Sequence, residues 1–377
     1  MQAHAGRRRA ALLSSVSPMP SRFLEDKRKP IGDYDRIRFD ENEISALRNR
    51  LDIDAPLLVH WEWDYVREVE TLRRLYEKGK TAQWNAETDV DWSQHISETE
   101  WPMPPEDSII VQVLAMVGRD EATQKRAMRI ELEHTLSQLL HGEQAALQLC
   151  AQLVNSVSDV DTKLFAGQQV ADECRHVEVF AKLIARKLGV VHPIDPNIKY
   201  LLDEMLSARN WHMKAIGMQV LFEGVAMAII TDYAQRTNSP IVRQVMRLVA
   251  RDEARHAAFG VLALREEIRN LPAAEHEELE DWTWRCLEVV ANGLAMGMID
   301  HVAPVFELDP EAIAAALFSS PGFWDARYNL FNHTVLPNLK KLGLITARTQ
   351  PLYDRFRLLD AAPPNGSPGP SHLQFDA

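Results

Sequence analysis

The chain has 377 residues, of which 46% are hydrophobic and 25% charged, and its formal net charge is -12. This acidic balance argues against nucleic acid or an anionic membrane as the main partner, because both favour basic surfaces. The cysteines Cys150, Cys174 and Cys286 lack CxxC spacing, so neither a disulfide framework nor a zinc ribbon is expected, and a cytoplasmic location is favoured.

Both ends of the chain predict tails. Residues 1–30 contain a basic segment and an apolar run too short for a signal peptide, so a disordered tail is favoured over an organellar transit peptide. Residues 349–377 include a run rich in proline and glycine. No membrane span is expected, because no uncharged stretch reaches roughly 18–20 residues. The nearest, 215–231, contains Glu223.

The segment between the tails predicts an all-α protein, since helical periodicity recurs and alternating strand patterns are absent. Residues 31–120 predict helices over 41–80, followed by a long irregular strap. Trp84, Trp92 and Trp101 lie in polar surroundings within this strap and are expected to anchor it to the rest of the protein.

A four-helix bundle is predicted for residues 121–272. Polar or proline-bearing turns separate four helical stretches, at about 122–156, 160–188, 197–235 and 240–270. Residues 273–348 predict additional helices, at 275–302 and 322–345, that pack on the bundle or form a homodimer contact.

One short motif occurs twice in these helices, as Asp172-Glu-Cys-Arg-His176 and Asp252-Glu-Ala-Arg-His256. In a helix, a Glu and a His three residues later lie on one face about one turn apart, so both can reach one ion. A single pair of this kind on a charged helix usually belongs to a solvated face. The repetition of the motif favours a metal site.

Equal spacing indicates two further ligands. Di-iron bundles add one Glu from each of the two other helices, and both arms of a helical hairpin must be equally long for the ligands to meet at one depth. Glu143 lies 30 residues before Glu173, and Glu223 lies 30 residues before Glu253. The midpoint of each pair falls in a predicted turn.

The stretch around Glu223 is apolar on nearly every face, and a carboxylate there is costly unless it is paired or bound to a metal. A buried salt bridge is the alternative. The predicted metal ligands are Glu143, Glu173, His176, Glu223, Glu253 and His256, the first three mostly for one ion and the last three mostly for the other. Oxygen and imidazole ligands without a thiolate favour two iron ions, with manganese as the alternative.

The residues beside the ligands have predicted supporting roles. Asp172 and Asp252 are expected to accept the outer N–H of the histidine on the opposite motif helix. Arg175 and Arg255 pair with these aspartates or lie on the surface. Candidates for a substrate cavity are Ala146, Phe180, Gln219, Met227 and Phe259, although residues at such spacing are more often core. The other histidines, including His134, His192 and His301, are expected to be ordinary.

On these residues, the stretch 120–270 resembles the ferritin-like di-iron carboxylate superfamily. The D-E-x-R-H pair is especially similar to that of bacterial multicomponent monooxygenase hydroxylases and acyl-carrier desaturases. The resemblance implies a ferritin-like bundle, O2 activation at two ferrous ions and oxidation of an organic substrate.

Three positions depart from particular relatives. Phe180 stands where ribonucleotide reductase small subunits have a radical tyrosine, and Met227 stands where multicomponent hydroxylases have a threonine. Val249 stands where arylamine N-oxygenases, which the chain resembles in outline, have a third histidine. The subfamily therefore stays open.

The expected function is that of an O2-dependent oxidoreductase, a monooxygenase or oxidase, acting on a largely apolar small molecule or acyl chain. No reductase motif occurs, so the electrons are expected from a separate donor protein, a ferredoxin or a reductase. The alternative is a non-catalytic iron-binding protein for iron storage or peroxide scavenging. Storage bundles are usually shorter, whereas this chain has over 100 residues of additional helices.

Overall fold

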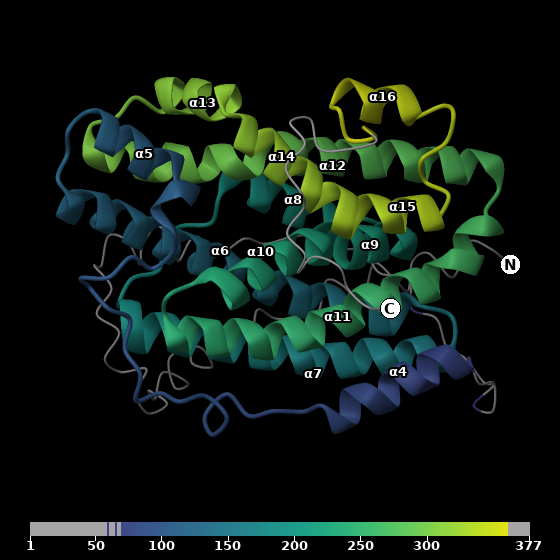
Figure 1. Cartoon of the computed structure of the whole chain (residues 1–377). Helices are drawn as coiled ribbons and strands as arrows, with labels where there is room; N and C mark the ends of the chain where they lie inside the picture. The colour runs from purple at the N-terminus through teal and green to yellow at the C-terminus, as the bar shows by residue number, and fades with distance from the viewer. Residues whose placement is uncertain (1–58, 60–64, 66–68, 361–377) are drawn as a thin grey trace, which may run out of the picture. The chain divides into compact units, whose positions relative to one another are not determined.

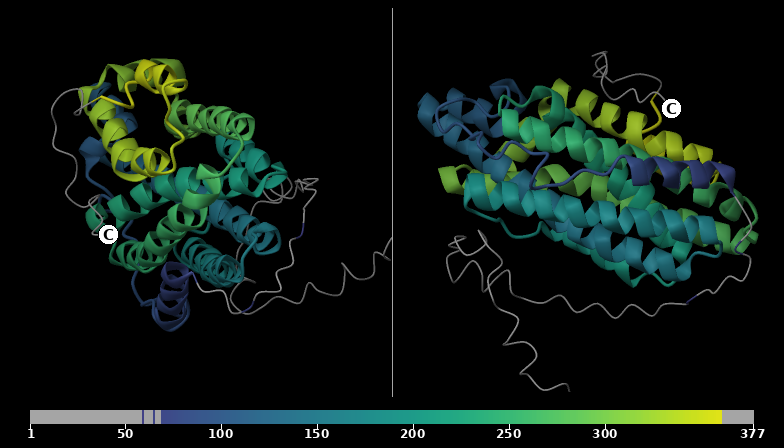
Figure 2. Two further views of the ribbon diagram at one scale, coloured as in Figure 1. Left: turned by 90° about the vertical axis from the view of Figure 1, so that its right-hand side faces the viewer. Right: turned by 90° about the horizontal axis from the view of Figure 1, so that it is seen from below.

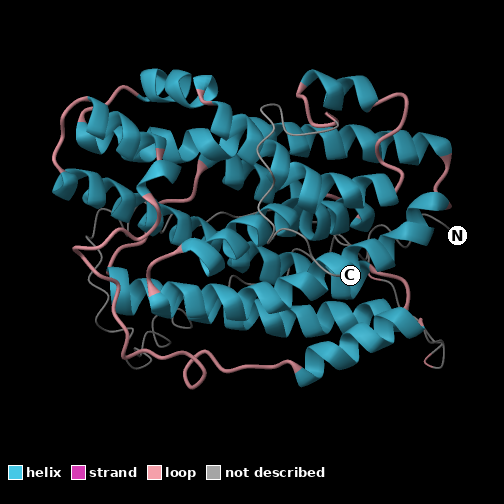
Figure 3. Ribbon diagram, viewed as in Figure 1, coloured by secondary structure: helices cyan, strands magenta, loops and turns pink. Residues whose placement is uncertain are grey.

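The computed structural model describes residues 59, 65 and 69–360, and all the regular elements in these residues are helices joined by loops (Figure 3). The predicted all-α class is therefore confirmed. In chain order the elements are α4 (Glu70–Thr81), η2 (Pro105–Asp107), α5 (Ile109–Met116), α6 (Glu121–Ser156), α7 (Val160–Leu183), η3 (Ile184–Leu188), α8 (Pro196–Ser207), α9 (Trp211–Ile216), η4 (Gly217–Phe222), α10 (Glu223–Arg236), α11 (Pro240–Arg269), α12 (Ala273–Val302), η5 (Ala303–Phe306), α13 (Pro310–Ser319), α14 (Pro321–Leu330), η6 (Phe331–Val335), α15 (Leu336–Lys341) and α16 (Gln350–Arg355).

Two helical hairpins form the centre of the protein. The first joins α6 to α7 through a short turn, in which Asp159 caps α7 by accepting a hydrogen bond from the backbone N–H of Thr162. The second joins the run from α9 to α10 with α11, which begins at Pro240, a residue suited to the first helical turn. Helices α7 and α11 lie side by side, with α4 against both (Figure 1).

The third predicted stretch is divided into several elements. Helix α8 ends at Ser207, and α9 begins after Asn210, whose side chain accepts a hydrogen bond from the backbone N–H of His212. The next segment, η4, is a π-helix that ends immediately before Glu223. Such wide turns are rare and frequently mark functional sites, because they redirect the side chains that follow.

The strap between α4 and η2 is held by its tryptophans. Trp84 is buried with Leu132 and Leu136 of α6, and Trp101 packs against a cluster formed by α5, α12 and α13. The carbonyl of Pro102 accepts hydrogen bonds from the turn between α10 and α11. The predicted helix over 41–80 is seen only as α4, because 41–58 and most of 59–68 lie outside the described residues, as does the predicted tail 1–30.

Additional helices cover one side of the bundle, and several of them differ from the prediction. Helices α5 and α13 were not predicted. Residues 349–360, predicted as the start of a tail, instead carry α16 and pack on the bundle. The reason is the apolar set around Tyr353, which is fully buried with its ring 4.8 Å from that of Trp284.

Within the described residues, two helical stretches are long and apolar enough to cross a membrane by length and composition, Trp211–Arg236 and Ala273–Phe306. Both contain charged residues, so they do not conflict with an expectation that rested on uninterrupted uncharged stretches. The first stretch is 83% buried and contains Glu223, so it is a central helix of the bundle. The long helices of the bundle run roughly along a common direction (Figure 2).

A close approach of two helices makes the fold sensitive to one glycine. A Cβ placed on Gly260 of α11 would lie 2.3 Å from Cβ of Gln219 in η4, whereas Gly167 of α7 has open space. We expect Gly260→Ala to destabilise the protein by about 1–3 kcal/mol, because the helices must separate. Gly167→Ala is the matched control and should be neutral or stabilising by up to about 1 kcal/mol. Urea unfolding followed by circular dichroism measures both, and equal effects would contradict the close approach.

Candidate metal centre

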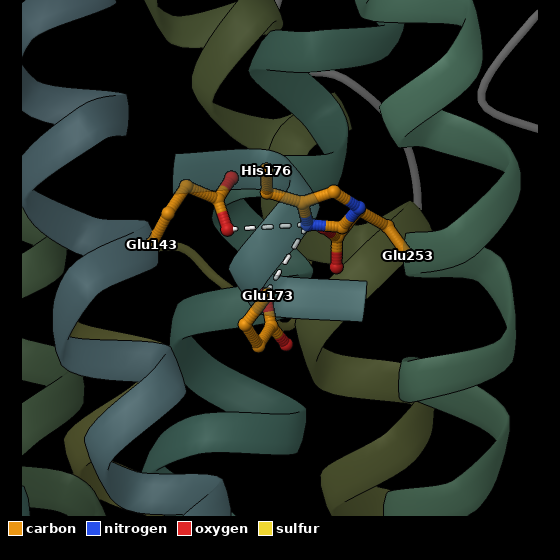
Figure 4. A group of neighbouring side chains, drawn as sticks. All are labelled: Glu143, Glu173, His176 and Glu253. Carbon is orange, nitrogen blue, oxygen red and sulfur yellow. Dashed lines mark hydrogen bonds and ion pairs between the residues drawn. The ribbon is translucent and has the colours of Figure 1, made fainter. Parts of the chain in front are cut away.

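The structure brings all six predicted ligands together inside the bundle, each at 5% exposure or less. Glu143 comes from α6, Glu173 and His176 from α7, Glu223 from the start of α10, and Glu253 and His256 from α11. The ligand atoms form two groups, and within each group they lie within 4.8 Å of one another. The first group comes from Glu143, Glu173, His176 and Glu253, and the second from Glu173, Glu223 and His256. Figure 4 shows the first group converging from three helices.

The ring of His176 faces two different environments. Its Nε2 lies 3.2 Å from Oδ2 of Asp252 and can donate a hydrogen bond to that carboxylate. Its Nδ1 faces carboxylate oxygens of Glu143, Glu173 and Glu253, at 3.3, 3.2 and 3.0 Å (Figure 4). When Nε2–H donates its hydrogen bond to Asp252, the neutral imidazole directs the lone pair of Nδ1 toward these oxygens. This group of atoms could hold a cation.

The ring of His256 repeats this arrangement. Its Nε2 lies 3.3 Å from Oδ2 of Asp172, and its Nδ1 lies 2.9 Å from Glu253 and 3.4 Å from both Glu173 and Glu223. Each motif aspartate thus contacts the histidine of the opposite motif helix. Glu173 and Glu253 approach both imidazoles, which is the arrangement expected of carboxylates shared by two ions.

The donor set fits a dinuclear metal centre. Four buried carboxylates carry more negative charge than two imidazoles can neutralise, and such burial is costly without cations. In addition, Oε1 of Glu253 is buried and makes no hydrogen bond although it lies 3.0 Å from Nδ1 of His176. Oxygen and imidazole donors without a thiolate suit iron or manganese.

The ligand side chains hold protons more tightly than usual. Burial raises the pKa of Glu143 to about 8 and, with the neighbouring Glu253, raises the pKa of Glu223. Burial opposes a charge on His176 and His256, yet the adjacent glutamates hold the pKa of both imidazoles well above their usual range. Metal binding must therefore displace protons from these ligands.

A ring of four charges lies behind the two histidines. Nη2 of Arg175 is 2.6 Å from Asp172 and 2.9 Å from Asp252, and Nη2 of Arg255 is 3.2 Å from Asp172 and 2.5 Å from Asp252. Both arginines therefore pair with the aspartates. Burial alone would raise the pKa of each aspartate, but the opposing histidine holds it below the usual range, and the arginines add to this.

The strap completes this ring in a way that the sequence did not indicate. Nε1 of Trp84 donates a hydrogen bond of 2.8 Å to Oδ2 of Asp252, and Nε2 of Gln83 donates one of 3.1 Å to Oδ1 of Asp172. The sequence identified Trp84 as an anchor, but its target is distant in the chain.

A pair of glutamines on the other side of the ligands was also missed. Nε2 of Gln169 donates to Glu173 at 2.9 Å and to Glu223 at 3.1 Å, and Oε1 of Gln169 accepts from Gln219 at 2.8 Å. Gln169 lies four residues before Glu173 and therefore on the same face of α7. This spacing was the available sequence signal.

An elongated cavity with a volume of about 150 Å³ reaches the carboxylates of Glu143 and Glu223. It lies among α6, α8, α10 and α12, and its walls are mostly apolar, including Leu139, Leu201 and Val290. The cavity is therefore on the outer side of the α6–α10 pair, where the additional helices cover the bundle.

Of the five predicted cavity residues, only Ala146 lines this cavity. Phe180, Gln219, Met227 and Phe259 do not line it, and their role in substrate binding stays a prediction. Phe180 belongs to a core cluster, Phe259 stacks on Phe165 with ring centroids 4.5 Å apart, and Gln219 hydrogen-bonds Gln169. Met227 is buried elsewhere. The helices that cover the bundle, rather than the ligand faces themselves, determine where space remains.

The contacts of the motif aspartates predict an effect on metal affinity. Asp172→Asn and Asp252→Asn each remove the carboxylate that orients a ligating imidazole, and we expect about 10–100-fold weaker binding of Mn²⁺. Equilibrium dialysis with metal analysis measures this. Asp281→Asn, which changes an exposed partner of Arg348, is the control and should bind as the wild type does. Unchanged affinity in both site variants would contradict the orienting role.

The pKa shifts predict that the stability of the metal-free protein falls, and that the stabilisation by added metal grows, as the pH rises. Glu143, with an ordinary value of 4.5 and a folded pKa of about 8, binds more protons folded than unfolded between these values, so stability falls as pH rises through this window. The raised histidines act in the same direction. We expect the metal-free protein to melt at a lower temperature at about pH 8 than at about pH 5.5, and the increase on adding Mn²⁺ to be larger at the higher pH. Scanning calorimetry measures both effects. A metal-induced rise in melting temperature that is no larger at about pH 8 than at about pH 5.5 would contradict this account of the site.

Comparisons with known proteins give the family. The model of the family described as P-aminobenzoate N-oxygenase AurF matches residues 66–336, more than two thirds of the chain. The chain is also similar to an R2-like ligand-binding oxidase with aerobically reconstituted Mn/Fe cofactor, at 17% identity, 77% coverage of this chain, 99% of that one and a TM-score of 0.45. Dimanganese(II)-NrdF of Streptococcus sanguinis is similar at 14% identity, with 76% coverage of this chain, 92% of that one and a TM-score of 0.45. No curated protein matches.

The family match confirms the predicted superfamily and narrows it. The especially close similarity expected to hydroxylases and desaturases is replaced by the N-oxygenase family, although Val249, fully buried, stands where a third histidine was expected in such enzymes. An enzyme with a dinuclear centre agrees with the geometry of the ligands. The chain belongs to the P-aminobenzoate N-oxygenase AurF family and is a non-haem di-iron oxygenase or oxidase.

Proposed function

We propose that the protein uses O2 at a centre of two irons, or of manganese and iron, to oxidise a largely apolar small molecule or acyl chain. The observation that carries this proposal is the mostly apolar cavity that Glu143 and Glu223 line. An iron-storage or scavenging protein has no need of an organic-sized cavity against its metal ligands. The family description adds amine N-oxygenation to the candidate reactions.

Glu143, Glu173, His176, Glu223, Glu253 and His256 would hold the two ions. When bound, such ions supply the redox chemistry of O2 activation. The protein's own contribution is geometry: Asp172 and Asp252 orient the imidazoles, and Gln169 fixes two of the carboxylates. The apolar walls exclude water from the side of the site where the substrate would lie.

The electrons would come from a separate donor protein, a ferredoxin or a reductase, since the chain has no reductase motif of its own. A homodimer through the additional helices and a cytoplasmic location remain parts of the proposal. The shared chemistry of the site is oxidation by O2; hydroxylation, N-oxygenation and desaturation are the alternatives that substrate identification would separate.

The test is anaerobic loading with Fe²⁺ followed by exposure to O2. We expect about two irons per chain and a transient visible absorption that decays faster when substrate is present. Glu223→Ala with Glu253→Ala should lose both iron and absorption, whereas Asp281→Asn should keep them. Hundreds of irons per assembly would favour storage, and full activity in the double variant would contradict the proposal.

A further inference from the structure

Polar side chains line the cavity at two levels of α6. Glu143, with Glu223 of α10, lies at one level, and His134, Thr135 and Gln138 lie at an earlier one. His134 lies nine residues before Glu143 on α6, which corresponds to about 13 Å along the helix axis. A bound molecule that contacts both levels would therefore extend from the metal ligands to His134.

The cavity has no cationic wall. Among the described residues that line it there is neither Lys nor Arg, while the lining includes the carboxylate of Asp195 in addition to the two glutamates. Asp195 is already used as the cap of α8, accepting from the backbone N–H groups of Asn197 and Ile198 at 2.7 and 3.2 Å. A substrate carboxylate at the level of His134 would be buried without a cationic partner, which is costly.

His134 is the group at this level with unused hydrogen-bonding capacity. Its side chain is 5% exposed, and its Nδ1 has no hydrogen-bond partner in the described part of the chain. In Gln138, by contrast, both polar atoms of the side chain are hydrogen-bonded. Its Nε2 donates to the carbonyl of Pro193 at 2.9 Å, and its Oε1 accepts from the backbone N–H of Asp195 at 2.7 Å. Buried polar atoms are usually paired, so an unpaired one on a residue that lines a cavity is a candidate partner for a bound ligand.

The surroundings of His134 keep it uncharged. Its ring packs against those of His301 and His192, with centroids 5.0 and 6.3 Å away, and these two histidines are themselves joined by a hydrogen bond of 2.7 Å. Burial, reinforced by these neighbours and His141, lowers the pKa of His134 to about 3. A neutral imidazole can donate or accept a hydrogen bond but offers no charge to an anion.

We propose that the substrate is an elongated, largely apolar molecule with an uncharged polar group, such as a hydroxyl or amide, that hydrogen-bonds His134, and that a carboxylate in this place, such as that of p-aminobenzoate, is disfavoured. This inference rests on the proposed function, since it takes the cavity as the substrate site. It assigns His134 a role in specificity, because the opposite end of the molecule is presented to the metal ligands.

The experiment uses the full chain loaded with Fe²⁺ without O2, so that binding is measured without turnover. The probes share one body and differ in one group: 4-butylphenol, 4-butylaniline, 4-butylbenzoate and butylbenzene, together with p-aminobenzoate. Isothermal titration calorimetry should show 4-butylphenol binding about tenfold more tightly than butylbenzene, the value of one good neutral hydrogen bond. The two carboxylates should bind at least about tenfold more weakly than 4-butylphenol.

Variants separate recognition from a general change in the cavity. His134→Phe should bring 4-butylphenol to the affinity of butylbenzene while changing butylbenzene less than about threefold, and His134→Asn should restore part of the preference. His212→Asn changes a buried histidine that does not line the cavity and is the matched control. Tight binding of 4-butylbenzoate, or equal losses for all probes in His134→Phe, would overturn the proposal. Failure of O2 chemistry would leave these affinities unchanged, so the two proposals fail separately.

Discussion

The burial of four glutamates in the middle of an apolar helical bundle is the constraint on which the rest of the structure depends. Carboxylates in such a place must be neutralised by cations, protons or hydrogen bonds. Imidazoles lie against Glu173 and Glu253, the pKa values of Glu143 and Glu223 are raised, and Gln169 donates amide hydrogen bonds. Two metal ions would complete the compensation, because the ligand atoms converge on the same space.

The charge ring behind the histidines connects this constraint to the architecture. Asp172 and Arg175 come from α7, and Asp252 and Arg255 from α11, so each hairpin contributes one of each sign. Because every aspartate contacts the histidine of the other helix, the hairpins can only pack in one register. The strap adds Trp84 to the same ring, which explains why a segment without regular structure follows a defined path.

The cavity shows how function depends on elements outside the bundle. A bare four-helix bundle would leave the α6–α10 side open to water, whereas α8 and α12 cover it with apolar side chains and enclose a space for an organic molecule. The covering helices α8 and α12 supply apolar walls, while α6 of the bundle itself carries both His134 and Glu143.

The sequence by itself determined the helical class, the two hairpins and the six residues that meet at the centre, because helical periodicity and equal arms of 30 residues are local and countable. It did not show α5, α13 or α16, whose short apolar stretches become helices by packing on the bundle. Nor did it show the partners of Trp84 or the place of His134, since both depend on contacts between segments far apart in the chain. Only the tertiary structure decided where the additional helices cover the bundle. The position of the cavity between them depends on how whole helix surfaces meet.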